Sequence, residues 1–166
     1  MRETDRVRFL DTLHRTLYKN VLRMNIDRNL TLAVLNYSDG KVSISGQHEE
    51  TLIVRASGLV ERIDTIDLGL PIALAENITD FIDRTLVDLQ PGDGIVLYTD
   101  GITEAKNMDR AQYGLERLCA IVSQHWQQSA EDIKQAVIAD VREFMNGQKQ
   151  FDDISLLILK QIHLTQ

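Results

Sequence analysis

Three aspartates lie where apolar segments of the sequence begin or end. Asp100 follows the apolar residues 95–98. Asp152 and Asp153 come directly before the apolar residues 154–160. If these segments are strands, a sheet holds the carboxylates rigidly, and Mg²⁺ and Mn²⁺ prefer such oxygen ligands. The sequence therefore allows a divalent-metal site built from Asp100, Asp152 and Asp153.

Both positions also have an ordinary structural interpretation. Aspartate before glycine, as in Asp100-Gly101, is common in turns. An Asp-Asp pair before a strand is equally typical of a solvated loop. Spacing alone leaves the metal site and the turn interpretation open.

The other potential nucleophiles and ligands point to structural roles. The single cysteine, Cys119, excludes a disulfide and a cysteine-based zinc site, and its place on the apolar side of a helix predicts burial. No nucleophile elbow or phosphate-binding P-loop motif is present. We expect His48 to make local hydrogen bonds. The other three histidines, His14, His125 and His163, are expected at the surface.

The strands that would position the aspartates are short and closely spaced. Parallel neighbours need long crossovers, so consecutive strands must be antiparallel. Residues 30–37 are almost continuously apolar, which predicts a strand buried on both faces. The segments with strand patterns are residues 30–37, 41–45, 51–55, 59–63, 79–89, 95–98 and 154–160.

Three segments carry apolar residues at helical spacing: residues 5–24, 114–126 and 130–146. Ser129 is expected to cap the last of these helices, and Gly147 to end it. The order of one helix, several strands, two helices and a final strand indicates an α+β fold.

Size and charge narrow the class of protein. The chain of 166 residues has the length of one domain, residues 1–166. Its net charge of −7 comes without a basic patch, which argues against nucleic-acid binding. No apolar run approaches the roughly 20 residues that a membrane span needs. We therefore expect a cytoplasmic protein with no nucleic-acid and no membrane partner.

Several short motifs follow one another in the order of a known family. Residues 96–105 resemble the motif "LYTDGxTEA", and residues 152–157 resemble "DDITLL". Between about residues 13 and 160, the chain resembles bacterial serine/threonine phosphatases of the PP2C (PPM) type, in the SpoIIE/RsbU-like subfamily. The further matching segments are residues 45–50 ("AGHxPP"), 89–93 ("L-x-PGD") and 113–118 ("fGxerL").

The resemblance implies a PP2C-like sandwich of antiparallel β-sheets flanked by α-helices, in α-β-β-α layers. It also implies a two-metal site for Mg²⁺ or Mn²⁺, and hydrolysis of phosphoserine or phosphothreonine in proteins by a metal-activated water. By motif position, Asp100 and Asp152 are the catalytic metal ligands. Asp153 is a further candidate metal ligand.

The chain departs from the family pattern in two places. Family members carry an N-terminal portion with a metal-bridging aspartate and a glycine-rich segment, and nothing before Asp5 matches it. We therefore expect a phosphatase domain truncated at the N-terminus, with an incomplete metal site and little or no activity in this chain alone. In addition, Ala73 stands where the family motif "P-x-G-L" has glycine.

The resemblance also implies partners. Family relatives act in bacterial partner-switching circuits on phosphorylated anti-anti-sigma (STAS-type) proteins, and an upstream sensor or receiver domain usually controls them. The alternative is a non-catalytic binding or dimerisation module with the phosphatase fold. In that case a homodimer could form by exchange of the first helix between chains.

Overall fold

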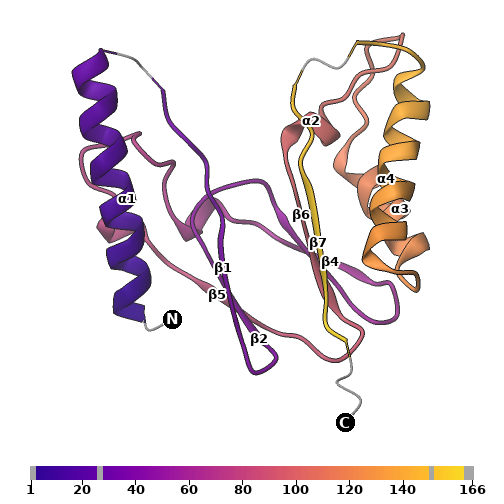
Figure 1. The fold of residues 1–166 in the computed structure, drawn as a ribbon, viewed down its shortest axis with the longest axis horizontal. Helices are drawn as coiled ribbons and strands as arrows, with labels where there is room; N and C mark the ends of the chain where they lie inside the picture. The colour runs from indigo at the N-terminus through magenta and orange to yellow at the C-terminus, as the bar shows by residue number, and fades with distance from the viewer. Residues whose placement is uncertain (1–2, 26–27, 150–151, 163–166) are drawn as a thin grey trace. The chain divides into compact units, whose positions relative to one another are not determined.

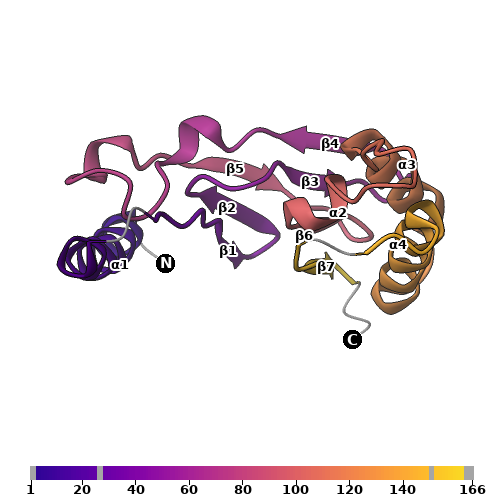
Figure 2. The ribbon, with the colours of Figure 1, turned by 90° about the horizontal axis from the view of Figure 1, so that it is seen from above.

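The computed structural model describes residues 3–25, 28–149 and 152–162. Contacts divide the chain into two compact units, whose helices and strands are shown in Figures 1 and 2. The first unit is Met1–His48 with Asp64–Asp88, and the second is Glu49–Ile63 with Leu89–Gln166.

The first unit contains a sheet of three antiparallel strands in the order β1-β2-β5. Its strands are β1 (Val34–Ser38), β2 (Lys41–Ser45) and β5 (Thr85–Asp88). In the β1–β2 hairpin, Ser38 pairs with Lys41. The turn residues Asp39 and Gly40 have φ angles of 50° and 77°. A type I′ turn needs positive φ at both positions, and Asp-Gly tolerates it.

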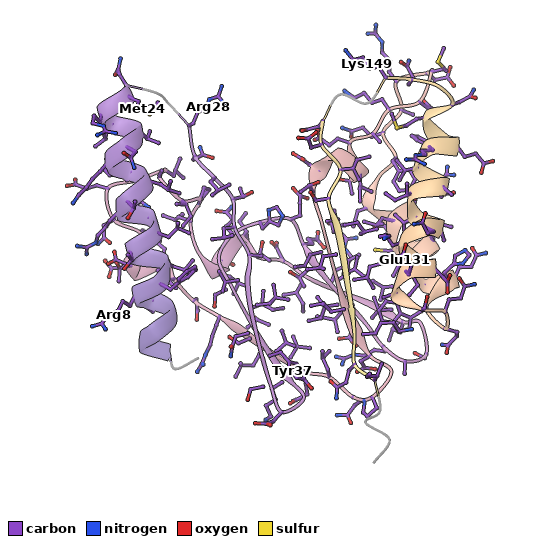
Figure 3. All side chains as sticks on the ribbon, viewed as in Figure 1. Arg8, Met24, Arg28, Tyr37, Glu131 and Lys149 are labelled. Atoms are coloured by element: carbon purple, nitrogen blue, oxygen red, sulfur yellow. The ribbon has the colours of Figure 1, made fainter. Side chains whose placement is uncertain are left out.

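Helix α1 (Glu3–Met24) confirms the helix predicted over residues 5–24. In Figure 3, Arg8 is labelled in its N-terminal part and Met24 at its C-terminal end. Leu10 of the helix forms a buried contact with Ile72 and Ile78. Partly buried apolar residues surround this contact: Leu13, Leu17, Leu32, Val34, Leu70 and Ile82.

His14 is fully buried on α1, so its predicted surface position is wrong. Its Nδ1 accepts a hydrogen bond from the backbone N–H of Ala73 (3.1 Å), and its Nε2 lies 3.3 Å from the carbonyl oxygen of Glu76. A proton on Nε2 satisfies both contacts. Leu10 and His14 are one helical turn apart and share a face, which is why the histidine points inward.

Two predicted strands are shorter than expected. Within residues 30–37 only β1 is a strand, and it is not buried on both faces, because Tyr37 is 59% exposed (Figure 3). Within residues 79–89 only β5 is a strand, because Thr79–Phe81 form a short 3₁₀ helix. The side chain of Asn77 accepts a hydrogen bond from the first N–H of this helix (3.0 Å). Such local bonds replace strand pairing there.

The second unit contains a sheet of four antiparallel strands in the order β4-β3-β6-β7. The strands are β3 (Thr51–Val54), β4 (Val60–Ile63), β6 (Gly94–Tyr98) and β7 (Leu156–Lys160). The helices are α2 (Asp100–Thr103), α3 (Leu115–His125) and α4 (Ala130–Met145). In both views α3 and α4 lie side by side and cover one face of this sheet (Figures 1 and 2). The side chain of Ser129 caps α4 as predicted, and Asn146 with φ 47° ends it one residue before Gly147.

The core of the second unit follows the strand register. Leu52, Val96 and Ile158 pair across three neighbouring strands, so their side chains share one face. Trp126 packs against Gly94, where an added Cβ would lie 2.9 Å from the indole. The buried residues are Leu52, Val54, Val96, Tyr98, Ile102, Tyr113, Leu118, Val122, Trp126, Ile133, Val137, Val141 and Met145.

Asp93, in the turn before β6, is a structural carboxylate and is only 3% exposed. It accepts hydrogen bonds from the backbone N–H groups of Ala56 (2.8 Å) and Gln90 (3.0 Å), and from the guanidinium of Arg55 (3.0 Å). Burial opposes the charge, but these donors outweigh it and hold the pKa of Asp93 below its usual value. The aspartate of the "PGD" motif therefore stabilises this turn through its hydrogen bonds.

We expect Asp93→Asn to lower the free energy of unfolding by about 2–3 kcal/mol near neutral pH, because it removes the charge and turns an amide toward N–H donors. The depressed pKa means that the contribution of Asp93 is present above the unfolded-state pKa of about 4, and is lost as pH falls through the lower folded-state pKa. Urea unfolding at neutral and acidic pH measures this.

A matched control is Asp88→Asn, since Asp88 lies 3.6 Å from Lys41 in an exposed ion pair. Its effect should stay within about 0.5 kcal/mol. Equal losses in both variants, or an Asp93 effect that does not shrink in acid, would contradict the assignment.

Ala73 has φ 68°, a left-handed conformation that costs a non-glycine residue about 1 kcal/mol. We expect Ala73→Gly to raise the free energy of unfolding by up to about 1 kcal/mol, because glycine adopts this angle without strain. The control is Ala139→Gly on the exposed side of α4. This change should lower the free energy of unfolding by about 1 kcal/mol, because glycine is a poor helix former. Thermal unfolding of both variants tests this, and a loss at both positions would argue against strain at Ala73.

Candidate functional site

Asp100 and the Asp152–Asp153 pair come to the same end of the second unit's sheet. Asp100 begins α2, immediately after β6, and the pair precedes β7. β6 and β7 are antiparallel neighbours, so the end of β6 meets the start of β7. Figure 1 shows α2 at this end of β6. The topology thus brings the two backbone segments that carry these aspartates to the same end of the sheet, although the three carboxylates do not gather closely enough to form a metal-binding group.

Thr99 ties the two segments together beyond the last strand pair. Its backbone N–H donates to the carbonyl of Ser155 (3.1 Å), and its hydroxyl donates to the carbonyl of Asp153 (3.1 Å). The same hydroxyl accepts a hydrogen bond from the N–H of Ser155 (3.0 Å). The threonine of the "TDG" motif therefore ties the backbone that follows β6 to the backbone of Asp153 and Ser155.

Gly101 is required by the close approach of these segments. A Cβ on Gly101 would lie 2.3 Å from the carbonyl oxygen of Asp153 and 3.5 Å from the carbonyl carbon of Asp152. Real Cβ atoms do not come so close to backbone oxygen, so any larger residue must push the segments apart. Glycine is thus needed at this position because the two backbones pack closely, and not because a turn there requires a positive φ angle.

The carboxylates of Asp100 and Asp152 are exposed, whereas Asp93 at the other end of β6 is buried. The backbone N–H of Asp153 donates to Oδ1 of Asp152 (2.7 Å), which orients that carboxylate. Both this hydrogen bond and that of Thr99 involve main-chain atoms of Asp153: its N–H binds the Asp152 carboxylate, and its carbonyl binds the Thr99 hydroxyl. Asp100 and Asp152 thus present solvent-facing carboxylates on two backbone segments that Thr99 ties together.

These residues fit part of a metal site. Mg²⁺ is commonly held by one or two carboxylates and keeps several waters, which suits Asp100 and Asp152. Over residues 3–25, 28–149 and 152–162, however, no three His, Cys, Asp or Glu side chains gather closely enough to hold a metal ion. The described residues therefore fit one hydrated ion better than a two-ion cage.

A pocket of about 480 Å³ opens beside Asp152. Figure 1 shows α2 and the C-terminal end of α4, which both contribute to it, at the same end of the unit. Asp152 was predicted from the sequence as a site residue, and Glu104 lies in the motif of residues 96–105. The sequence does not point to Lys106, Asn107 and Arg110, because the part of the loop after residue 105 carries no recognised motif. The lining residues are Gly101, Glu104, Ala105, Lys106, Asn107, Arg110, Met145, Gln148 and Asp152.

Tyr113 anchors the far end of the pocket loop. Its N–H donates to the carbonyl of Ala105 (2.8 Å), and its hydroxyl donates to Asp140 of α4 (2.6 Å). Arg117 binds the same carboxylate through two nitrogens at 2.8 Å and lies over the rings of Tyr113 and Phe144. Arg117 and Tyr113 hold the pKa of Asp140 below its usual value. The "fGxerL" motif thus fastens the loop to α3 and α4.

The remaining candidates have structural surroundings. In the first unit, His48 makes the predicted local bonds: its Nδ1 lies 3.0 Å from the Thr31 hydroxyl, and its N–H donates to the Thr65 hydroxyl (2.9 Å). Cys119 is half-buried against the core of the second unit, and burial raises the pKa of its thiol. His125 is half-buried, and His163 lies outside the described residues.

None of the helices that the structure describes is long and apolar enough to cross a membrane.

One curated protein is similar to this chain over most of the chain's length. Protein IcfG of Synechocystis sp. (strain ATCC 27184 / PCC 6803 / Kazusa) is 30% identical over 132 residues, which are 77% of this chain and 20% of that protein. The chain therefore spans about a fifth of this curated relative.

Solved structures share the fold at low sequence identity. The SiaA-PP2C domain of Pseudomonas aeruginosa superposes with a TM-score of 0.65 at 15% identity, over 92% of this chain and 69% of that one. The phosphatase domain of SpoIIE from Bacillus subtilis gives a TM-score of 0.60 at 15% identity, over 92% of this chain and 75% of that one. The predicted PP2C-like α+β fold is confirmed.

Sequence comparison extends the likeness over almost the whole chain. Residues 1–161 match the family described as Stage II sporulation protein E (SpoIIE). The chain belongs to the SpoIIE family of PP2C-type phosphatase domains.

Proposed function

We propose that this chain is part of a metal-dependent protein phosphatase domain that removes phosphate from phosphoserine or phosphothreonine on a regulatory protein. The observation that carries the proposal is the β6–β7 junction. There, Thr99 and Gly101 hold Asp100 and Asp152 side by side at one sheet end. Membership in the SpoIIE family supports the same chemistry.

In this proposal, Asp100 and Asp152 hold Mg²⁺ or Mn²⁺, with the carboxylate of Asp153 as a further candidate ligand. Such ions acidify a water molecule and offset the charge on phosphoryl oxygens. The chain's own residues prepare the site. Thr99 and Gly101 fix the two backbones, and the N–H of Asp153 turns the Asp152 carboxylate. Little rearrangement is then needed when an ion and a phosphate bind.

We further propose that the full domain takes its remaining metal ligands from an N-terminal portion. Support comes from coverage: this chain corresponds to 69% and 75% of the two solved phosphatase chains. On this proposal the chain alone is weakly active or inactive. Its natural setting is a cytoplasmic signalling protein with an upstream sensor or receiver domain and a phosphorylated STAS-type substrate.

A second candidate function is a non-catalytic binding or dimerisation module. It is favoured by one observation, the lack of any three potential metal ligands gathered together in the part of the chain that the structure describes. Activity measurements separate the two candidates, because only the first requires a metal-dependent reaction.

We expect hydrolysis of p-nitrophenyl phosphate with Mn²⁺ to be strong only in a version extended upstream in the native gene, since that version completes the ligand set. Asp100→Asn in the extended version should lower the rate at least about 100-fold and weaken Mn²⁺ binding in calorimetry, because a direct ligand is lost.

The control is Asp109→Asn, an exposed carboxylate on the nearby loop that does not line the pocket. It should leave both rate and Mn²⁺ affinity unchanged. No activity in any version would favour the non-catalytic module, and full activity of the 166-residue chain would overturn the proposed split of ligands.

We expect Gly101→Ala to weaken Mn²⁺ binding about as much as Asp152→Ala, and to destabilise the fold by about 1–3 kcal/mol through overpacking. The control is Gly147→Ala, where φ is 83° but no atom lies within 4 Å of an added Cβ. It should cost stability without changing Mn²⁺ affinity. Unaltered Mn²⁺ affinity in folded Gly101→Ala would show that the junction does not set the site.

A further inference from the structure

The pocket beside Asp152 has the size of a ligand site. Its volume of about 480 Å³ lies within the range of roughly 300–1,000 Å³ that is usual for such sites. Gly101 and Asp152 form its wall at the candidate metal end. Lys106, Asn107 and Arg110 form another wall, from the loop between α2 and α3.

The pocket loop is held in one conformation by its own hydrogen bonds. Oδ1 of Asn107 accepts from the N–H groups of Asp109 (3.0 Å) and Ala111 (2.9 Å). The N–H of Arg110 donates to the carbonyl of Asn107 (3.0 Å), and Arg110 itself has φ 63°. Lys106 pairs with Gln112 across the base of the loop. The two basic residues are therefore carried on an ordered turn.

Lys106 and Arg110 are exposed, and neither has a side-chain partner among the residues that the structure describes. Within the described residues, neither side chain makes a hydrogen bond or an ion pair. By contrast, Arg55, Arg62 and Arg117 of the same unit are each held by carboxylates at 2.6–3.0 Å. In a chain with a net charge of −7, two unpaired cations on one pocket wall are available for an external anion.

At the α4 end of the pocket, carbonyls of the last helical turn already accept hydrogen bonds from backbone N–H groups. The carbonyls of Arg142 and Glu143 accept hydrogen bonds from the N–H of Asn146, and that of Met145 accepts one from the N–H of Gln148. Lys149, next in the chain, lies beyond this helix end (Figure 3). The acidic lining residues are Glu104, which lies on the same loop as Lys106 and Arg110, and Asp152.

We propose that Lys106 and Arg110 form a subsite for an acidic side chain close to the phosphorylated residue of the substrate. This inference rests on the proposed function, which places the phosphate at Asp100 and Asp152. The flanking peptide then enters the adjoining pocket, and its Asp or Glu meets the two cations. Substrate choice would thus follow acidic sequence beside the phosphoserine.

The test is binding of two fluorescein-labelled phosphoserine peptides to this chain with Mn²⁺, followed by anisotropy. One peptide has glutamates on both sides of the phosphoserine, and the other has glutamines. We expect the glutamate peptide to bind roughly five- to tenfold more tightly at low ionic strength, and added salt to reduce the difference, because exposed charges are screened.

The double substitution Lys106→Gln/Arg110→Gln should bring the ratio of the two affinities close to one. The control is Lys134→Gln on α4, whose lysine pairs with the exposed Glu131 (Figure 3) and should leave the ratio unchanged. Arg110→Glu should invert the preference toward a peptide with lysines in place of the glutamates.

Equal binding of both peptides, a preference that survives the double substitution, or no measurable binding of either peptide would overturn the inference. The proposed function fails separately, if the upstream-extended version does not hydrolyse phosphate with Mn²⁺. A charge preference that depends on Lys106 and Arg110 in a protein without hydrolysis would leave the subsite standing as part of a binding module.

Discussion

The contact between the end of β6 and the segment before β7 is the constraint on which the candidate site depends. One hydroxyl, that of Thr99, donates to the carbonyl of Asp153 and accepts from the N–H of Ser155. One missing side chain, at Gly101, lets the backbones touch. Because both effects act on main chain, the position of Asp100 relative to Asp152 follows from the sheet rather than from flexible side chains.

Strand β6 carries an aspartate at each end, and their surroundings give them opposite roles. Asp93 before the strand is buried and saturated with three donors, so its charge stabilises a turn. Asp100 after the strand is exposed, and in the proposed function its carboxylate binds a cation. Both residues are aspartates, so the difference comes from their surroundings. The hydrogen-bond donors around Asp93 give its carboxylate a structural role, whereas the exposed carboxylate of Asp100 is accessible to a ligand.

The rest of the second unit supports this end of the sheet. Arg117 and Asp140 fasten Tyr113, and Tyr113 fastens the loop that follows α2. The same loop carries Lys106 and Arg110 to the pocket beside Asp152. The ion pair between Arg117 of α3 and Asp140 of α4 thereby helps to set the positions of Lys106 and Arg110. The packing of α3 against α4 is in this way linked to the pocket.

The sequence by itself determined the α+β class, the antiparallel direction of closely spaced strands, the three long helices α1, α3 and α4, and the family motifs around Asp100 and Asp152, because periodicity and turn chemistry are local. It did not determine the burial of His14 or the lining role of Lys106 and Arg110. Those features depend on which distant segments meet: Ala73 and Glu76 at His14, and the end of α4 at the loop. Only the tertiary structure decides such contacts, because they join residues far apart in the chain.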